Sequence, residues 1–372
     1  RDLHLSLRRQ RQMCIRDSHC CFLHLWPNPS TPAQTQPVRG RPHFADVLAT
    51  VPNLNRHRLQ LSSAGAPLTL EDGAGGSWIA ASFTVRWRSV ALPEPVMLAR
   101  RIAGPFASFE SAERLAQRWR ALGVTASVAH PNDWEVWAPQ GSMVPEGTKV
   151  RDWTRRVHAT VEPMLETPEG VQPIKGPLQI AAPDGLRWNR GVFRGPFRLQ
   201  RDAYGSWTLI EQVAVERYLE GVVPHEIGAS SPVAALQAQT VLARTWALAN
   251  SHRFHIDGYH LCSDTQCQVY SDPRLAGAAV RQAIAATRGR LLSRAGRPIS
   301  AVYHATNGGV MAAGPEAWAM QPQPYLVAKV DGDEGWRERH AIPLQRPQLV
   351  SSLFCLLYTS PSPRDKRQSR MP

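Results

Sequence analysis

The segment from Tyr218 to Leu248 constrains the fold more than any other part of this chain. It begins with the apolar residues Tyr218, Leu219, Val222 and Val223, which favour a buried strand that ends at Pro224, a residue with no N–H to donate. Ser231 and Pro232 have the pattern of a helix N-cap followed by proline at the first helical position. From Val233 to Leu248 apolar residues occur nearly all round the helical projection, so we expect a buried helix whose polar side chains need partners.

One acidic residue, Glu226, lies in the expected tight loop between this strand and this helix, next to Val223 and Ile227. Apolar surroundings disfavour the charged form of a carboxyl group, and a carboxyl that stays protonated near neutral pH can act as a general acid. Glu226 is therefore our candidate catalytic residue. The alternative is a loop acid that accepts hydrogen bonds from a helix N-terminus.

The same segment carries a longer pattern. It reads Tyr218-Leu219-x-Gly221-Val222-Val223-x-x-Glu226, followed by Ala235-Leu236-x-Ala238-Gln239-x-x-x-Ala243-Arg244-Thr245. This pattern resembles the signature of the stage II sporulation protein D (SpoIID) family, which also includes the LytB-type amidase enhancers. The resemblance covers about Thr148 to Phe354 and implies that Gln239 and Arg244 contact the substrate.

The resemblance implies a lytic transglycosylase that acts on the glycan strands of peptidoglycan. Ordinary glycosidases use two carboxylates, but Glu220, Asp257 and Asp264 lack an equally apolar setting within the motif. One carboxyl suffices if the attacking group is the 6-hydroxyl of the N-acetylmuramic acid itself, which yields a 1,6-anhydro product and requires no cofactor. The alternative implied by the family is a non-catalytic, glycan-binding enhancer or scaffold for a cell-wall amidase.

Four residues downstream have the side chains of a metal site: His255, His260, Cys262 and Cys267. Some members of the resembled family hold zinc near this position with two His and two Cys, but here Gln266 stands where a His would be expected. A structural zinc site, a local disulfide between the two cysteines, and two reduced cysteines are all compatible with the spacing, so these alternatives stay open.

Two further stretches are candidates for the substrate site. A Cys-Gln-x-Tyr match contains Gln268 and Tyr270, and a later strand leads into paired glycines, which allow close approach of the backbone to a ligand. The resemblance implies that this later stretch lies beside the active site, although Asn307 replaces the more usual Ser or Cys. Its candidate residues are Tyr303, His304, Thr306, Asn307, Gly308 and Gly309. The alternative for these polar groups is ordinary hydrogen bonding within a loop.

The two ends of the chain are set aside. Residues 12–18 and 355–360 can be encoded by opposite strands of one DNA sequence, which is typical of a library adapter translated in frame. We expect residues 1–18 and 355–372 to be adapter-derived and disordered, with the true N-terminus lost and the last domain truncated. These ends contribute +6 to the formal net charge of +13, so the rest carries +7.

That charge suits attraction to an anionic wall polymer, whereas no zinc finger, RNA-binding signature or dense basic patch supports nucleic acid. We therefore expect peptidoglycan glycan strands as the partner, together with a cell-wall amidase in the alternative function, and no nucleic acid. The resemblance implies a bacterial cell envelope location, outside the cytoplasm. The sequence does not establish whether the chain is membrane-anchored, and it has no apolar run long enough to span a bilayer.

Periodicity divides the remainder into parts. Residues 19–76 are rich in Pro, Ser, Gln, Ala and Gly and predict a mostly disordered linker. Residues 77–145 show strand, helix, strand, strand, with Ser108 as the helix N-cap, and resemble SPOR-like modules, which recognise glycan strands; a small α+β domain of unknown partner is the alternative. Residues 146–354 begin with a meander of short antiparallel strands and contain the catalytic core, 216–336. The expected fold class is thus α+β: a mixed helix and antiparallel-strand catalytic domain preceded by a small α+β module and a β-rich segment.

Overall fold

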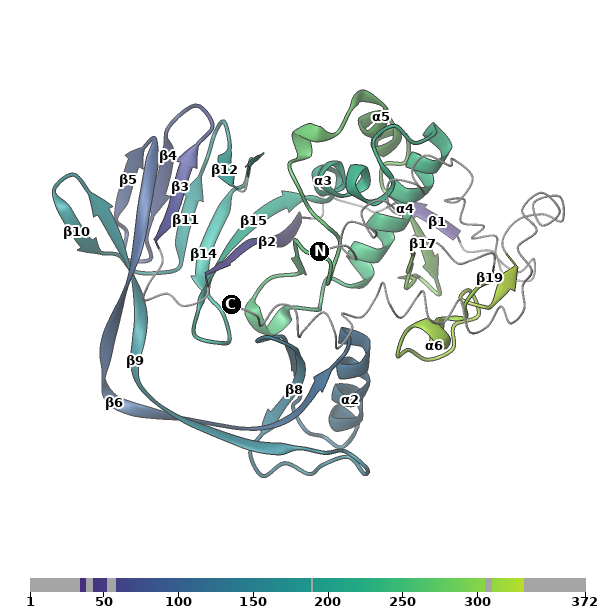
Figure 1. The fold of residues 1–372 in the computed structure, drawn as a ribbon, viewed down its shortest axis with the longest axis horizontal. Helices are drawn as coiled ribbons and strands as arrows, with labels where there is room; N and C mark the ends of the chain where they lie inside the picture. The colour runs from purple at the N-terminus through teal and green to yellow at the C-terminus, as the bar shows by residue number, and fades with distance from the viewer. Residues whose placement is uncertain (1–33, 38–42, 52–57, 189, 305–309, 331–372) are drawn as a thin grey trace, which may run out of the picture. The chain divides into compact units, whose positions relative to one another are not determined.

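A computed structural model of the 372-residue chain describes residues 34–37, 43–51, 58–188, 190–304 and 310–330 (Figure 1). The chain forms two compact units that are interleaved along the sequence. The larger unit holds the described residues from 34 to 99 and from 154 to 301, and the smaller holds 100–153 with the described residues from 302 onward. The unit boundaries therefore fall at 99/100, 153/154 and 301/302, whereas the expected domains follow one another along the chain.

The first sheet of the larger unit has the strand order β16-β2-β15-β14-β11-β4-β5. Its pairs are antiparallel except for β16 with β2, which is parallel. The strands are β2 (His43–Val51), β4 (Leu68–Glu71), β5 (Ser77–Ala80), β11 (Leu178–Ala181), β14 (Phe197–Arg201), β15 (Trp207–Ala214) and β16 (Leu261–Cys262). β15 is buried along nearly its whole length because it lies inside the sheet and leads directly into the helices.

The second sheet of the larger unit has the order β10-β9-β6-β3-β12-β13. Its strands are β3 (Leu59–Ser63), β6 (Ser82–Phe106), β9 (Arg151–Thr167), β10 (Gly170–Pro173), β12 (Leu186–Trp188) and β13 (Gly191–Phe193). Trp87 of this sheet lies 5.5 Å from Trp207 of the first sheet, centroid to centroid, and Trp207 donates its indole N–H to the carbonyl of Val161 at 3.1 Å. These contacts show that the two sheets pack against each other. The predicted antiparallel strands of residues 148–215 are present, but they are divided between the two sheets, and β11 pairs with β4 and β14, so they do not form a single meander.

Part of the expected linker is ordered sheet. Leu59, Leu61, Leu68 and Leu70 are buried in β3 and β4, where residues two apart face the same side of a strand. The prediction of a mostly disordered segment is wrong for residues 59–71, and also for Gln34–Pro37 and His43–Val51, which form β1 and β2. The two short strands are separated by Ser, Ala, Gly and Pro, so the segment as a whole contains few apolar residues. This composition suggested disorder, although the apolar residues within each strand alternate with a period of two.

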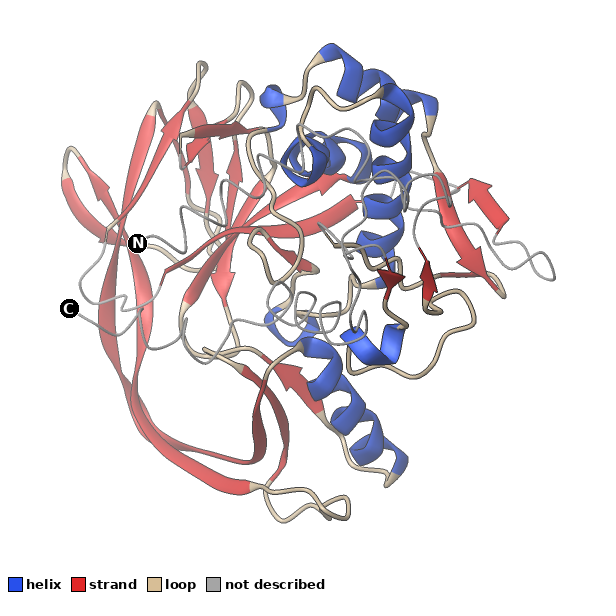
Figure 2. Ribbon diagram, turned by 45° about the vertical axis from the view of Figure 1, so that its right-hand side comes forward, coloured by secondary structure: helices blue, strands red, loops and turns tan. Residues whose placement is uncertain are grey.

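Three helices of the larger unit pack together: α3 (Val215–Ile227), α4 (Val233–Ala249) and α5 (Ala278–Ala286) (Figure 2). The segment expected to be a strand, residues 218–223, is in fact the middle of α3. The buried positions of α3 recur at spacings of three and four residues, which is the period of a helix. β-Branched composition therefore misled the assignment, and periodicity would have corrected it.

The remaining elements of the larger unit flank these helices. A three-stranded sheet with the order β1-β17-β18 comprises Gln34–Pro37, Arg290–Arg294 and Arg297–Pro298, and β17 packs on α4. The segment after Asp272 forms a 3-10 turn, η2 (Pro273–Leu275), and then α5, while η1 (His255–Asp257) follows α4. α4 ends at Ala249, one residue after the expected Leu248. Its N-cap is Pro232, without a side-chain hydrogen bond, so the expected cap by Ser231 is wrong.

The smaller unit packs helix α2 (Phe109–Ala121) against β7 (Ser127–Ala129) and β8 (Trp134–Pro139), with β8 paired to the end of β6. Ser108 caps α2, since its hydroxyl accepts the N–H of Ser111 at 3.2 Å. Trp119 is fully buried and donates its indole N–H to the carbonyl of Met143 at 2.7 Å, so it belongs to the core. The unit also contains β19 (Val310–Met311), α6 (Gly314–Ala317) and β20 (Lys329–Val330).

The predicted strand, helix, strand, strand order is thus confirmed for this region, and the overall α+β class is confirmed for the chain. The resemblance to SPOR-like modules stays a prediction. None of the helices in the described residues is both long enough and apolar enough to cross a membrane.

Asp257 lies in a buried polar cluster beside the first sheet. Its carboxylate accepts the N–H of Ala203 at 3.1 Å and the hydroxyl of Tyr204 at 2.8 Å, and the residue is 3% exposed. Burial raises the pKa of Asp257 to about 6, and the neighbouring charge of Asp202 acts in the same direction, although the two hydrogen bonds oppose it.

We expect Asp257 to make the fold less stable as pH rises. A carboxyl whose folded-state pKa is raised binds its proton more tightly in the folded state, so its stabilising effect is lost between about pH 4 and pH 6. Relative to Asp257→Asn, the wild type should lose about 3 kcal/mol of unfolding free energy over this range. Urea denaturation of both proteins from about pH 4 to pH 7 measures this. Parallel stability curves for the two proteins would contradict the assignment.

Candidate functional site

Glu226 lies in the last turn of α3 and is half-buried. The helix ends at Gly228, whose N–H donates to the carbonyl of Pro224 at 3.1 Å, and the hydroxyl of Ser231 donates to the carbonyl of Ile227 at 2.6 Å. These bonds close a tight turn from α3 to α4, so the acid stands at a helix end where a loop was expected. The C-terminal end of a helix carries partial negative charge.

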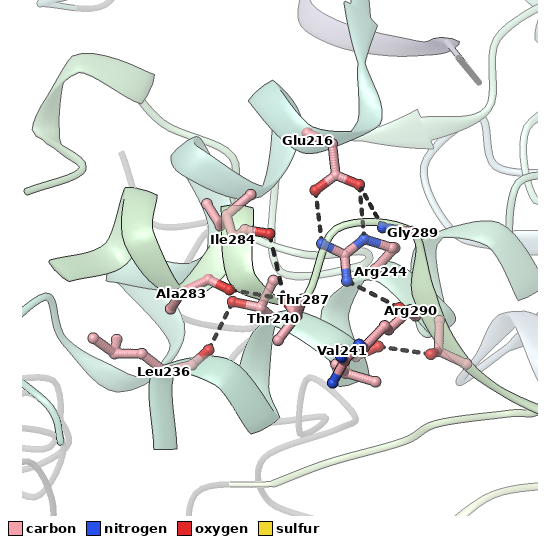
Figure 3. Close-up of polar contacts among 11 residues, drawn as sticks. Glu216, Leu236, Thr240, Val241, Arg244, Ala283, Ile284, Thr287, Gly289 and Arg290 are labelled. Atoms are coloured by element: carbon pink, nitrogen blue, oxygen red, sulfur yellow. Dashed lines mark hydrogen bonds and ion pairs between the residues drawn. The ribbon is translucent and has the colours of Figure 1, made fainter. Parts of the chain in front are cut away.

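Arg244 of α4 is fully buried and bound on three sides within the fold (Figure 3). Its Nε and Nη2 donate to the two carboxylate oxygens of Glu216 at 3.0 and 2.7 Å, and its Nη1 donates to the carbonyl of Arg290 at 2.9 Å. The N–H of Gly289 also reaches Glu216, at 3.4 Å. The ion pair therefore joins α3, α4 and the start of β17, and the guanidinium that was predicted to contact substrate has no exposed surface.

Among the other polar residues of α4, two threonines have hydrogen-bond partners within the helix and one glutamine amide has none. The hydroxyls of Thr240 and Thr245 donate to carbonyls four residues back, those of Leu236 and Val241, each at 2.6 Å. Gln239 is 4% exposed, and its Nε2 has no hydrogen-bond partner among the described residues. A buried donor without a partner costs about 1–3 kcal/mol, so Gln239 is the predicted substrate residue on α4 that still has a donor to offer.

Gln268 and Tyr270 lie in the core rather than on a cleft wall. Gln268 accepts the hydroxyl of Tyr218 at 3.1 Å and donates to the carbonyl of Ala243 at 3.3 Å. Tyr270 stacks on Tyr218, with centroids 5.2 Å apart, and donates its hydroxyl to Glu211 at 2.8 Å. Both residues are at most 5% exposed. This network fixes the loop after β16 to α3 and α4.

Glu211 completes that network from β15. It is fully buried, and its second carboxylate oxygen accepts the N–H groups of Arg194 and Gly195 at 3.1 and 3.0 Å. Burial raises the pKa of Glu211, while its hydrogen bonds with Gly195, Tyr270 and Arg194 oppose that shift. An acid that is held in this way organises the backbone around it and has no exposed face for a ligand.

The stretch with the paired glycines is described in part. Tyr303 and His304 are half-buried residues of the smaller unit. Thr306, Asn307, Gly308 and Gly309 lie outside the described residues. Their predicted contact with substrate therefore stays a prediction.

The two cysteines are bonded to each other, Cys262 to Cys267, so the structure adopts the disulfide alternative. A disulfide sulfur is not a thiolate ligand, and zinc needs thiolates or other deprotonated donors. His255 is exposed, and the pKa of half-buried His260 is lowered by burial and by the neighbouring charge of His255. Throughout the described ranges no three His, Cys, Asp or Glu residues are grouped to hold a metal ion, so these residues do not fit a four-ligand zinc site.

Sequence reasoning missed two acids that organise this region, buried Glu211 and half-buried Glu216, and it named Asp257 only as an acid in a less apolar setting. A signal existed for Glu211, because it lies two residues from both Leu209 and Val213 and so shares their buried face of β15. Glu216 stands in the first turn of α3, where an acid is favoured by the helix dipole, but α3 was assigned as a strand.

Gly221 of the motif allows close packing of α3. A Cβ at this position would lie 2.5 Å from the carbonyl oxygen of Ser271 and would overlap the ring of Tyr270. Gly221→Ala should therefore lower the free energy of unfolding by about 1–3 kcal/mol, measured by chemical denaturation. Gly277→Ala is the matched control, because no atom lies within 4 Å of its added Cβ, and it should cost less than about 1 kcal/mol. Equal effects at the two positions would argue against steric packing at Gly221.

Arg244→Met should lower the free energy of unfolding by about 3–5 kcal/mol, since it leaves Glu216 largely buried without its partner. The double variant Arg244→Met/Glu216→Leu should recover part of that loss, because no unpaired charge is left. Arg290→Ala is the control: only the backbone carbonyl of Arg290 binds Arg244, so the change should alter stability by less than about 0.5 kcal/mol. A fully stable Arg244→Met protein would show that the ion pair does not hold the helices together.

Comparisons with known proteins agree with the motif. Residues 203–293 match the family described as stage II sporulation protein, SpoIID. A 121-residue segment, 32% of this chain, is 36% identical to the amidase enhancer of Bacillus subtilis (strain 168). A 107-residue segment, 27% of the chain, is 33% identical to an uncharacterized protein of Brachyspira hyodysenteriae.

These aligned segments cover 16% and 28% of the two relatives' own lengths, so each relative is much longer than the part it shares with this chain. The matched residues 203–293 contain β15, α3, α4 and α5, and with them Glu226, the Glu216–Arg244 ion pair and the disulfide. Residues 203–293 are therefore similar to the stage II sporulation protein (SpoIID) family.

Proposed function

We propose that this chain acts on peptidoglycan in the bacterial cell envelope, as a lytic transglycosylase in which Glu226 is the single catalytic carboxyl. The observation that carries the proposal is the position of Glu226: half-buried, in the last turn of α3, within the segment that matches the SpoIID family. The first step of the reaction requires a protonated acid.

In the proposed reaction, the protonated carboxyl of Glu226 donates its proton to the glycosidic oxygen that leaves C1 of N-acetylmuramic acid. The resulting carboxylate then accepts the proton of the 6-hydroxyl of the same sugar as that oxygen bonds to C1. The products are a 1,6-anhydro sugar end and a free hydroxyl on the neighbouring sugar. Glu226 is protonated again at the end, so no water, metal or cofactor is consumed.

Gln239 is the second residue that we assign to this site. Its Nε2 lacks a partner among the described residues, and a substrate oxygen would supply one once this side chain, 4% exposed here, turns outward. Arg244, Gln268 and Tyr270 act indirectly in this proposal, because their bonds hold α3 and α4 in place.

Glu226→Gln should reduce release of 1,6-anhydro ends by about 100-fold or more, because an amide cannot donate the required proton. The measurement is mass spectrometry of glycan strands, stripped of their stem peptides, after incubation with the purified protein. Glu220→Gln is the matched control on the same helix, since Glu220 forms an ion pair with Arg217 at 3.6 Å, and it should keep its activity. Unchanged product release by Glu226→Gln would remove Glu226 from the catalytic role.

The name of the Bacillus subtilis relative, amidase enhancer, favours a second function: a glycan-binding scaffold that stimulates a cell-wall amidase. The two functions differ in one measurement. A scaffold yields no anhydro ends by itself but accelerates the release of stem peptides by an added amidase, and Glu226→Gln would not change that stimulation.

A further inference from the structure

The smaller unit contains a pocket of about 400 Å³ that is separate from the Glu226 region in the sequence and uses none of its residues. One wall is a face of α2, where lining residues recur at helical spacing: Ser111, Arg114, Leu115 and Arg118. The other walls come from the end of β6, with Phe106, and from residues 147–149. This volume suits a small molecule or one or two rings of a longer one.

Three cations line this pocket: Arg114, Arg118 and Lys149. Within the described part of the chain, none of them forms an ion pair with a carboxylate. Arg114 and Arg118 each donate to a backbone carbonyl, those of Met320 at 3.4 Å and Glu146 at 2.5 Å. Each guanidinium therefore has further N–H donors for a ligand, and their fork matches the oxygens of a carboxylate or phosphate.

The uncharged groups that line the pocket suit a polar ring, to which the carboxylate or phosphate of the ligand would be attached. The hydroxyl of Thr148 is buried and has no hydrogen-bond partner among the described residues. Gly104 and Gly147 expose backbone at the rim, and Phe106 offers a half-buried aromatic side chain. An aromatic ring beside hydrogen-bonding groups suits a sugar, which has an apolar C–H face and polar edges.

We propose that this pocket binds a negatively charged sugar, one that carries a carboxylate or a phosphate. Arg114, Arg118 and Lys149 bind the anionic group, and Thr148 supplies a hydroxyl to the ring. The site is independent of the chemistry proposed for Glu226.

The test uses the full chain and four probes: glucuronate, glucose 6-phosphate, neutral glucose and inorganic phosphate. Saturation-transfer NMR and competition titrations should show saturable binding of the two acidic sugars, weaker binding of phosphate alone, and none of glucose. Added salt should weaken this binding, because it screens the charges. The tighter of the two acidic sugars identifies the preferred anionic group.

Arg114→Ala and Lys149→Ala should each weaken binding of the acidic sugars by about tenfold, since each removes a charge-assisted hydrogen bond. Arg297→Ala, which removes an exposed arginine from the larger unit, is the matched control and should bind as the wild type does. Glu226→Gln should also bind normally, which separates this proposal from the catalytic one. Equal binding of glucose and glucuronate, unchanged affinity in Arg114→Ala, or no binding of either acidic sugar would overturn it.

Discussion

The buried ion pair between Arg244 and Glu216 is the interaction on which the arrangement of the helices depends. The ion pair is bidentate, and the guanidinium also binds a carbonyl at the start of β17. The side chain of Arg244 therefore connects α3, α4 and β17. A charge buried so completely is tolerated only when its donors are satisfied, and here the geometry allows that. Glu226 lies ten residues after Glu216 on the same helix, so its place in the fold follows from this contact.

A second set of contacts acts from the opposite side of α3. Tyr218 stacks on Tyr270 and binds Gln268, and Gly221 leaves room for that tyrosine ring. Most polar residues of the motif are therefore used to hold α3 against α4 and the loop after β16. The motif encodes packing as much as chemistry, and Glu226 and Gln239 are its two members that these contacts do not explain.

The sequence predicted the α+β class, the antiparallel strands, the cap of α2 at Ser108 and the buried helix α4, because each has a strong period or a cap residue. It failed at α3, where β-branched residues suggested a strand although their spacing was helical. It also could not predict that Arg244 and Gln268 turn inward. A polar residue in a motif looks the same whether its partner is a substrate or an acid far away in the sequence, and Glu216 is 28 residues from Arg244.

The acids that are bound within the fold reduce the number of carboxylates available for catalysis. A mechanism with two carboxylates needs a second acid that substrate or water can reach. Asp257 has a raised pKa, which is the usual mark of a catalytic acid, but it is 3% exposed and bound to Tyr204 and Ala203. Glu211 is fully buried, and Glu216 is committed to Arg244. Glu226 is half-buried and takes no part in these contacts, which is compatible with the proposed reaction, in which the substrate's own hydroxyl replaces the second carboxylate.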